Sequence, residues 1–264
     1  MKKKLNKYIK KIIDIFRMRE LRVLPGNLAF FFVMALIPII TVILTWFSGY
    51  SSSLIKLINE VFPPQASAVL TSVISSKEFG RSNVTFNIVA FFLASNGTYA
   101  IINAANTLYK IDKSDALKDR IRSIILLIIL IGLIVFLLVV PMFGGKILSL
   151  FAKMNFYNQI IIIYNIFKWP VTFFLIYVVL KLIFTIAPSK NIKSKDTTYG
   201  ALFTTFIWTV SSVVFGYYLQ NIANYSIMYG NLSSIIVLMM WIYLISYVFV
   251  LGMAINSIEM FKDK

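Results

Sequence analysis

The chain has 264 residues, of which 59% are apolar and only 14% are charged. Soluble domains are about 45–50% apolar and about 25% charged, so the composition excludes an ordinary soluble globule and also intrinsic disorder. It indicates an integral membrane protein. The sequence has no Cys and no His, which removes thiol nucleophiles, histidine bases, haem and the common zinc and iron sites. We therefore expect no enzyme activity, no metal and no cofactor.

The net charge of +16 is unevenly distributed. Nine of the 26 Lys and Arg residues precede the first long apolar run. Basic residues of inserted chains stay on the cytoplasmic side, where anionic lipid attracts them. Residues 1–26 are therefore predicted to form a cytoplasmic, basic amphipathic segment that ends at Pro25-Gly26. A nucleic-acid-binding tail is the weaker interpretation, because no aromatic stacking motif accompanies the charge.

Six apolar segments are long enough to cross about 30 Å of hydrocarbon as helices. They are predicted at roughly 27–49, 84–107, 121–143, 160–187, 199–219 and 231–258. With the N-terminus in the cytoplasm, 19 basic residues fall on the inner side and 5 on the outer side. This distribution predicts an all-α, six-helix transmembrane domain over residues 27–264, with both termini cytoplasmic.

The first outer loop is predicted to be a helical hairpin over residues 53–76. Two short amphipathic pieces, 53–62 and 66–75, are separated by Pro63-Pro64. Each piece is too short to span the bilayer, so both are expected to lie on or dip into the outer leaflet. The hairpin is interpreted as a lid that caps the bundle, and a gate over an external cavity is the alternative.

Polar or small side chains share one side on four of the predicted spans, at 100° per residue. Such groups are costly in hydrocarbon and tend to face a bundle interior. They indicate either dry packing through hydrogen bonds and small residues or a hydrated substrate path. Asn favours the path more than Ser or Thr does, because its amide cannot be satisfied on its own helix. The candidate path residues are Asn27, Thr41, Asn96, Asn103, Asn106, Lys181, Thr205, Ser212, Asn256 and Glu259.

Charged residues within or near the spans are few. Lys181 lies near the inner end of the fourth span, where it is interpreted either as snorkelling to the interface or as an anion or headgroup anchor with Glu259 as counter-charge. Asp112, Asp115 and Asp119 cluster beside five basic residues, and such interleaved charges are typical of a solvated loop rather than a metal site. The sequence contains no phosphate-binding glycine loop and no nucleophile elbow.

The spans also carry short motifs. In the first two spans these are Leu28-Ala29-Phe30-Phe31, Leu36-Ile37-Pro38, Ser95-Asn96-Gly97 and Asn106-Thr107-Leu108-Tyr109. In the last third they are Tyr199-Gly200-Ala201 with Trp208, Tyr229-Gly230-Asn231-Leu232, Leu238-Met239-Met240-Trp241-Ile242-Tyr243-Leu244 and Gly252-Met253-Ala254-Ile255-Asn256. Together they resemble the YihY/BrkB family of bacterial inner-membrane proteins over nearly the whole chain. Ala254 stands where that family usually has an acidic residue, and the arginine that usually follows the second-span tyrosine has no clear equivalent.

The resemblance implies a six-helix protein of the bacterial inner membrane, suspected of transport and linked to virulence or envelope traits. The family has also carried a ribonuclease label, which nothing in this sequence supports. We expect a transporter or lateral pathway for a lipid-like or anionic amphiphile, with membrane lipids as partners and no nucleic acid. A non-transporting envelope scaffold is the alternative, and a membrane-bound ribonuclease is the third. A homo-oligomer is left open, because small-residue stripes also serve protomer interfaces.

Overall fold

The computed structural model describes residues 18–46, 52, 55–56, 58–59, 64–75, 84–111, 115–132, 157–221 and 229–260. The named helices are α2 (Glu20–Trp46), α4 (Pro64–Ser75), α5 (Val84–Leu108), α7 (Tyr157–Ile186), α8 (Thr198–Asn221), the 3-10 turn η3 (Gly230–Leu232) and α10 (Ser233–Met260). Residues 116–132 form a further helix. These elements confirm the predicted all-α fold.

Four stretches of the described helices are long and apolar enough to cross a membrane: Glu20–Ile40, Ile88–Leu108, Thr198–Leu219 and Ser233–Ile258. Pro170–Ile186, within α7, is a shorter apolar stretch. A helix satisfies its own backbone hydrogen bonds, which lipid cannot do, so apolar runs of this length adopt it. The predicted third span, 121–143, is described only as far as residue 132. The count of six spans therefore stays a prediction.

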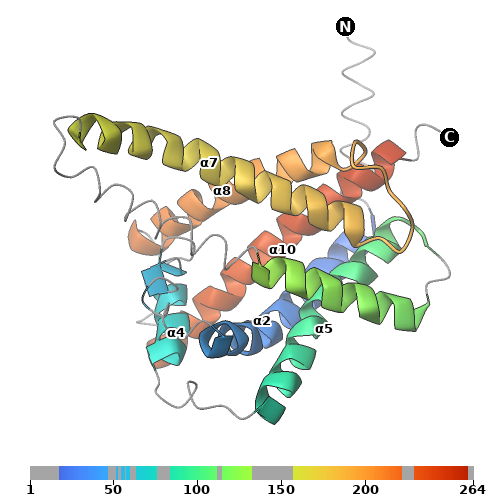
Figure 1. The fold of residues 1–264 in the computed structure, drawn as a ribbon, viewed down its shortest axis with the longest axis horizontal. Coiled ribbons are helices and arrows are strands. Elements are labelled where there is room, and N and C mark those ends of the chain that lie inside the picture. Colours follow the sequence, from blue (N-terminus) through green and yellow to red (C-terminus); the bar gives the residue numbers. More distant parts are fainter. Residues whose placement is uncertain are drawn as a thin grey trace, which may run out of the picture.

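Helix α10 lies at the centre of the bundle and contacts α2, α4, α5 and α8. Helix α7 packs on α8, and α5 packs on α2, so the two pairs flank α10 from different sides (Figure 1). The α2–α5 contact is close because Gly97 of α5 faces Ala35 of α2: a Cβ built on Gly97 would lie 2.9 Å from the Ala35 Cβ. The Trp208 Nε1–H of α8 donates to the Ile245 carbonyl of α10 at 2.8 Å.

The core has two parts. One joins the C-terminal halves of α5, α7 and α10 to the start of α8, with Phe184 and Phe249 fully buried and their ring centroids 4.9 Å apart. The other joins α2, α4 and the first half of α10, and it includes Leu70 and Trp241. The first part lies beneath the loop end of the molecule that carries the polar site described below.

The prediction that Pro25-Gly26 ends an N-terminal segment was wrong. Helix α2 begins at Glu20 and continues through both residues. Proline in a helix removes one hydrogen bond to the carbonyl four residues earlier. Here the loss falls in the second turn, close to a helix start where backbone bonds are in any case incomplete, and Pro25 is buried against the bundle. Residues 1–17 of the predicted amphipathic segment lie outside the described residues.

The outer hairpin is described mainly through its second limb. Helix α4 begins at Pro64, where the sequence predicts a break, because proline is well tolerated at the first position of a helix. The α4 residue Leu70 and the neighbouring Ile58 are buried in the same apolar cluster as Trp241 of α10. The interpretation as a lid or as a gate stays a prediction.

Helix α5 ends in a tight turn that sets the direction of the next helix. Lys110 has a φ of 51°, in the left-handed region that favours glycine. The Ile111 N–H donates to the Asn106 carbonyl at 2.9 Å, which closes the end of the helix. The chain then reverses, so that residues 116–132 run back along α5.

Candidate functional site

Asn106 forms the centre of a buried polar cluster near the end of α5. Its Nδ2 donates to Asp119 Oδ2 at 3.2 Å and to Ser189 Oγ at 2.8 Å. Its Oδ1 accepts from the Ser189 backbone N–H at 2.8 Å. One amide therefore joins three segments that are far apart in the chain: α5, helix 116–132 and the α7–α8 loop. We call these three residues the polar latch.

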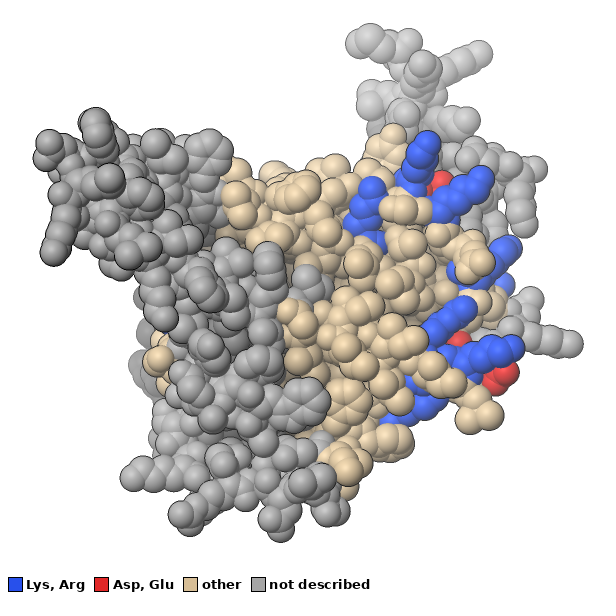
Figure 2. All heavy atoms as spheres, viewed as in Figure 1, with Lys and Arg blue, Asp and Glu red and all other residues tan. Residues whose placement is uncertain are grey.

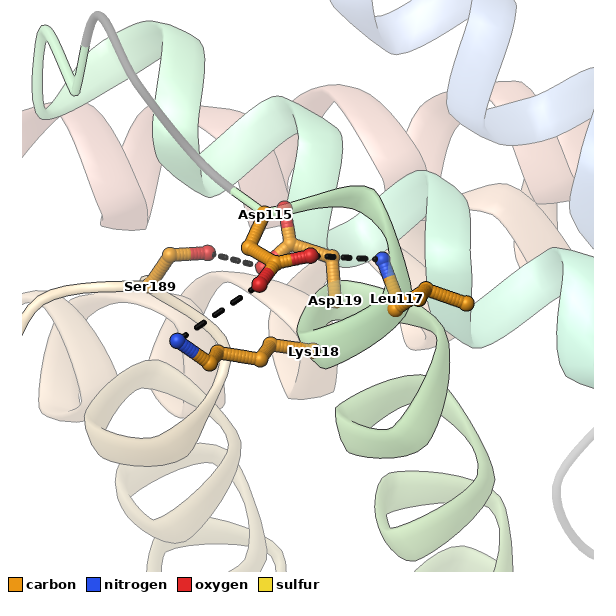
Figure 3. A network of polar contacts seen from close by, with 5 residues as sticks. All are labelled: Asp115, Leu117, Lys118, Asp119 and Ser189. Carbon is orange, nitrogen blue, oxygen red and sulfur yellow. Dashed lines mark hydrogen bonds and ion pairs between the residues drawn. The ribbon is translucent and has the colours of Figure 1, made fainter.

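Figure 3 shows how the carboxylates around the latch differ. The Ser189 hydroxyl donates to Asp119 Oδ1 at 2.5 Å, and Asp119 is 2% exposed. Asp115 instead lies at the surface, where its Oδ1 accepts from the Leu117 N–H and its Oδ2 pairs with Lys118 Nζ at 3.5 Å. The Leu117 N–H and Lys118 lower the pKa of the Asp115 carboxyl. The predicted solvated acidic loop is thus right for Asp115 and wrong for Asp119, while Asp112 lies outside the described residues.

A second polar contact lies on the outward face of α5. The Arg120 Nη1 donates to Asn96 Oδ1 at 2.9 Å, and its Nη2 donates to the Phe92 carbonyl at 3.3 Å. The guanidinium carbon is 4.0 Å from the centroid of the Phe92 ring and 5.8 Å from that of Tyr99. Phe92, Asn96 and Tyr99 are four and three residues apart, so they form one stripe on α5. Arg120 is therefore held against the first half of the apolar stretch Ile88–Leu108.

The α8–α10 crossing is the tightest helix contact at the site. A Cβ built on Gly200 would lie 2.1 Å from the Gly252 carbonyl oxygen and 2.5 Å from the Asn256 amide. Asn256 is fully buried, and its Oδ1 accepts from the Gly200 N–H at 2.7 Å, which satisfies a free donor in the first turn of α8. Its Nδ2 has no hydrogen-bond partner among the described residues.

Lys181 is partly buried on α7. Its Nζ lies 5.7 Å from the centroid of the Tyr177 ring. The neighbouring Thr185 hydroxyl lies 3.0 Å from the hydroxyl of Thr197, which links α7 to the start of α8. The predicted pairing of Lys181 with Glu259 stays a prediction, because the Glu259 side chain lies outside the described ones.

The remaining predicted path residues differ in how far they are buried. Asn27 and Asn103 are exposed, Ser212 is partly buried, and the Thr41 side chain lies outside the described ones. Thr205 is fully buried, and its hydroxyl donates to the Ala201 carbonyl of its own helix at 2.8 Å. The structure thus brings Asn106, Asn96 and Asn256 into three separate contacts rather than one shared stripe.

Three contributors to the site were missed as site residues by the sequence interpretation: Arg120, Asp119 and Ser189. The Arg120 contact had one sequence signal, because Phe92, Asn96 and Tyr99 lie on the face of α5 that also carries exposed Ile88. Tyr109, next to the latch, is also buried, with no hydrogen-bond partner for its hydroxyl among the described residues. Burial, together with the nearby Asp196 carboxylate, raises the pKa of Tyr109.

Basic side chains gather at the loop end of the molecule (Figure 2). Lys and Arg occupy the right-hand edge of the visible face, with a few acidic side chains between them, and the described surface beside them is free of charge. The exposed lysines at the end of α5, at the start of helix 116–132 and in the α7–α8 loop, which we call the basic rim, are Lys110, Lys118, Lys190, Lys193 and Lys195. Such a one-sided distribution is typical of the cytoplasmic side of a membrane protein.

The described residues contain no group of three or more His, Cys, Asp or Glu side chains that could hold a metal ion. A helical bundle with long apolar helices, outward apolar side chains and a basic rim at one end defines an integral membrane protein. More narrowly, the family model for the virulence factor BrkB matches residues 12–262, so the chain belongs to that family, as its motifs indicate.

Three relatives show the range of names in the family. The ribonuclease-like protein YfkH of Bacillus subtilis strain 168 is 28% identical over 262 residues, covering 95% of this chain and 94% of YfkH. The UPF0761 membrane protein of Chromobacterium violaceum is 25% identical, over 91% of this chain and 59% of that protein. The UPF0761 membrane protein PSHAa0171 of Pseudoalteromonas translucida is 26% identical, over 95% and 83% respectively. No solved structure matches the chain.

Cysteine labelling separates the outward polar residues from the enclosed ones. Single cysteines replacing Thr205 or Asn256, which are both fully buried, are expected to resist an aqueous maleimide in this Cys-free chain. Lys193→Cys, exposed on the basic rim outside the apolar stretches, is expected to react and serves as the positive control. Labelling of buried position 205 or 256 at the control's rate would mean that water enters the interior, contrary to this expectation.

Proposed function

We propose that this protein is a lateral membrane pathway for an anionic, lipid-like amphiphile. The observation that carries the proposal is a pair of cations, Arg120 and Lys181, each placed beside an aromatic ring on an apolar helix. The one ion pair within the described residues joins Lys118 to Asp115, so neither cation has a carboxylate partner there. Cations at such positions are costly unless they meet an anion, and they mark substrate or ion paths in membrane proteins.

The proposed pathway runs along the outer surface of the bundle rather than through its middle. The buried Asn106 amide and the Asn256 Oδ1 are engaged by neighbouring segments, and the glycine crossing of α8 with α10 leaves no room for a methyl group. Arg120 instead lies beside exposed apolar side chains, Phe92 among them. An amphiphile moving there keeps its chains in lipid while its charged group meets the cation.

Transport is tested with the full chain purified into liposomes. Labelled phospholipid analogues and organic anions are supplied on one side, and their transfer is measured against empty vesicles. We expect transfer to fall about tenfold or more in Arg120→Gln and Lys181→Gln, because a charge-assisted hydrogen bond is lost in each. Lys193→Gln removes the same charge from the basic rim and is expected to transfer nearly as well as the parent. Transfer no faster than in empty vesicles, across the whole panel, would contradict the proposal.

A non-transporting scaffold is the second candidate, and the polar latch favours it. Asn106, Asp119 and Ser189 satisfy one another, as expected of residues that only hold helices together. A scaffold predicts partners that co-purify and no transfer in liposomes. The ribonuclease-like name of the Bacillus relative gives a third outcome to check: the same purified protein is incubated with RNA, and we expect no cleavage.

A further inference from the structure

The Arg120 side chain is fixed in place but only partly used. Two of its N–H groups hold Asn96 Oδ1 and the Phe92 carbonyl oxygen. Arginine has five N–H donors in a planar fork, so three N–H groups have no hydrogen-bond partner among the described residues. The Phe92 ring lies 4.0 Å from the guanidinium carbon, which covers one face of the fork and leaves its edge for a ligand.

The guanidinium has no carboxylate within 4.0 Å in the described part of the chain. Its sequence neighbour Asp119 is turned away, because both carboxylate oxygens are taken by Asn106 and Ser189. Asp115 is paired with Lys118. A partly exposed positive charge, with N–H groups that have no partner among the described residues, therefore lies between α5 and helix 116–132.

Both helices beside Arg120 expose apolar side chains. On α5, Ile88, Val89, Phe92 and Leu93 are exposed, and helix 116–132 exposes an outward stripe four and three residues apart: Leu117, Ile121, Ile125 and Ile128. The opposite face of that helix is buried, with Leu126 and Leu127 fully enclosed. The Thr98 hydroxyl of α5 donates to the Ser123 carbonyl at 2.7 Å, which holds the two helices against each other.

We propose that the outward surface formed by α5 and helix 116–132 is a binding site for one anionic phospholipid, whose phosphodiester group is held by Arg120 and whose acyl chains lie along the two outward stripes. The planar fork matches phosphate oxygens in two-point contact. The adjoining basic rim favours an anionic headgroup over a zwitterionic one. A free phosphate ion can bind the same guanidinium, but it has no acyl chains to bury against the apolar stripes and is therefore expected to bind more weakly. The site gives the proposed pathway its substrate class, and it can also hold lipid without any transport.

Native mass spectrometry of the full chain in detergent tests the site. Phosphatidylglycerol, phosphatidylcholine and inorganic phosphate are titrated separately, and bound adducts are counted. We expect phosphatidylglycerol to bind most tightly, and Arg120→Gln to weaken it about tenfold or more. Arg120→Lys keeps the charge but loses the fork, so intermediate binding is expected. Lys193→Gln, which removes one charge from the basic rim, is expected to cost at most about fivefold.

Thermal unfolding of each variant without added lipid shows whether it is folded, and Arg120→Lys provides a second reading if Arg120→Gln is not. Equal binding of phosphatidylglycerol to parent and both Arg120 variants would overturn the site, and so would binding of inorganic phosphate as tight as that of lipid. The two proposals fail separately. Lipid binding without transfer in liposomes removes the pathway and keeps the site, whereas transfer by a parent protein that binds phosphatidylglycerol no more tightly than its Arg120 variants removes the site and keeps the pathway.

Discussion

Gly252→Ala is expected to destabilise the folded protein strongly, and Gly200→Ala, its counterpart across the contact, is expected to do the same. A Cβ on Gly252 would lie 1.9 Å from Thr204 Oγ1, 2.9 Å from the Gly200 carbonyl oxygen and 3.2 Å from Phe184 Cε2. Two of these neighbours belong to α8, so the methyl group would have to push the helices apart. Overpacking of this kind costs about 1–3 kcal/mol.

The same crossing carries the hydrogen bond from the Gly200 N–H to Asn256 Oδ1, which separation of the helices would also break. The free energy of unfolding is measured for the full chain in detergent by thermal or denaturant unfolding. Gly216→Ala on α8 is the matched control, because nothing lies within 4 Å of a Cβ built there. In a helix alanine is favoured over glycine by up to about 1 kcal/mol, so the control is expected to be neutral or slightly stabilised. Equal stability of Gly252→Ala and Gly216→Ala would show that the crossing is not tightly packed.

Sequence patterns predicted the helices well where apolar runs and breaks are strong. The second span was predicted at 84–107 and is observed as Val84–Leu108, and the fifth at 199–219 is observed as Thr198–Asn221. The proline pair at 63–64 marked the start of α4. The signal failed at Pro25, because proline predicts a helix end only when nothing around it compensates for the lost hydrogen bond. In α2 the loss falls in the second turn, and Pro25 is buried within a long apolar helix that continues past it.

The site was harder to predict than the helices. Periodicity gives the direction in which a side chain leaves its helix, but it does not say which neighbour lies there. Asn103 and Asn106 are one turn apart on α5, yet one is exposed and the other is buried, since helix 116–132 and the α7–α8 loop cover only part of that face. Arg120 directly precedes the predicted span 121–143, and its contact with Asn96 depends on how helix 116–132 crosses α5.

Small residues gave a clearer indication of contact than polar ones did. Gly97, Gly200 and Gly252 all lie where two helices approach closely, as expected of glycine at helix interfaces in membranes. Gly132 and Gly216 have nothing within 4 Å of a built Cβ, so glycine alone does not identify a contact. Gly200 and Gly252 are distinguished by Asn256, which lies one turn beyond Gly252 and closes the contact with a hydrogen bond.

Asn106→Ala is expected to lower the free energy of unfolding by at least about 2 kcal/mol, because each buried polar group left without a partner costs about 1–3 kcal/mol. The change removes both Nδ2 bonds and leaves the Ser189 N–H and the Asp119 carboxylate without their partners on α5.

Asn103→Ala is the matched control: it lies on the same helix, one turn away, and its side chain is exposed, so a change within about 0.5 kcal/mol is expected. Both variants are unfolded in detergent beside the parent. If they lose the same stability, the latch does not hold α5, helix 116–132 and the α7–α8 loop together, and the buried Asp119 then needs another partner. If only Asn106→Ala loses stability while transfer in liposomes persists, the latch is architectural and the cations on the outer surface remain the candidates for handling the amphiphile.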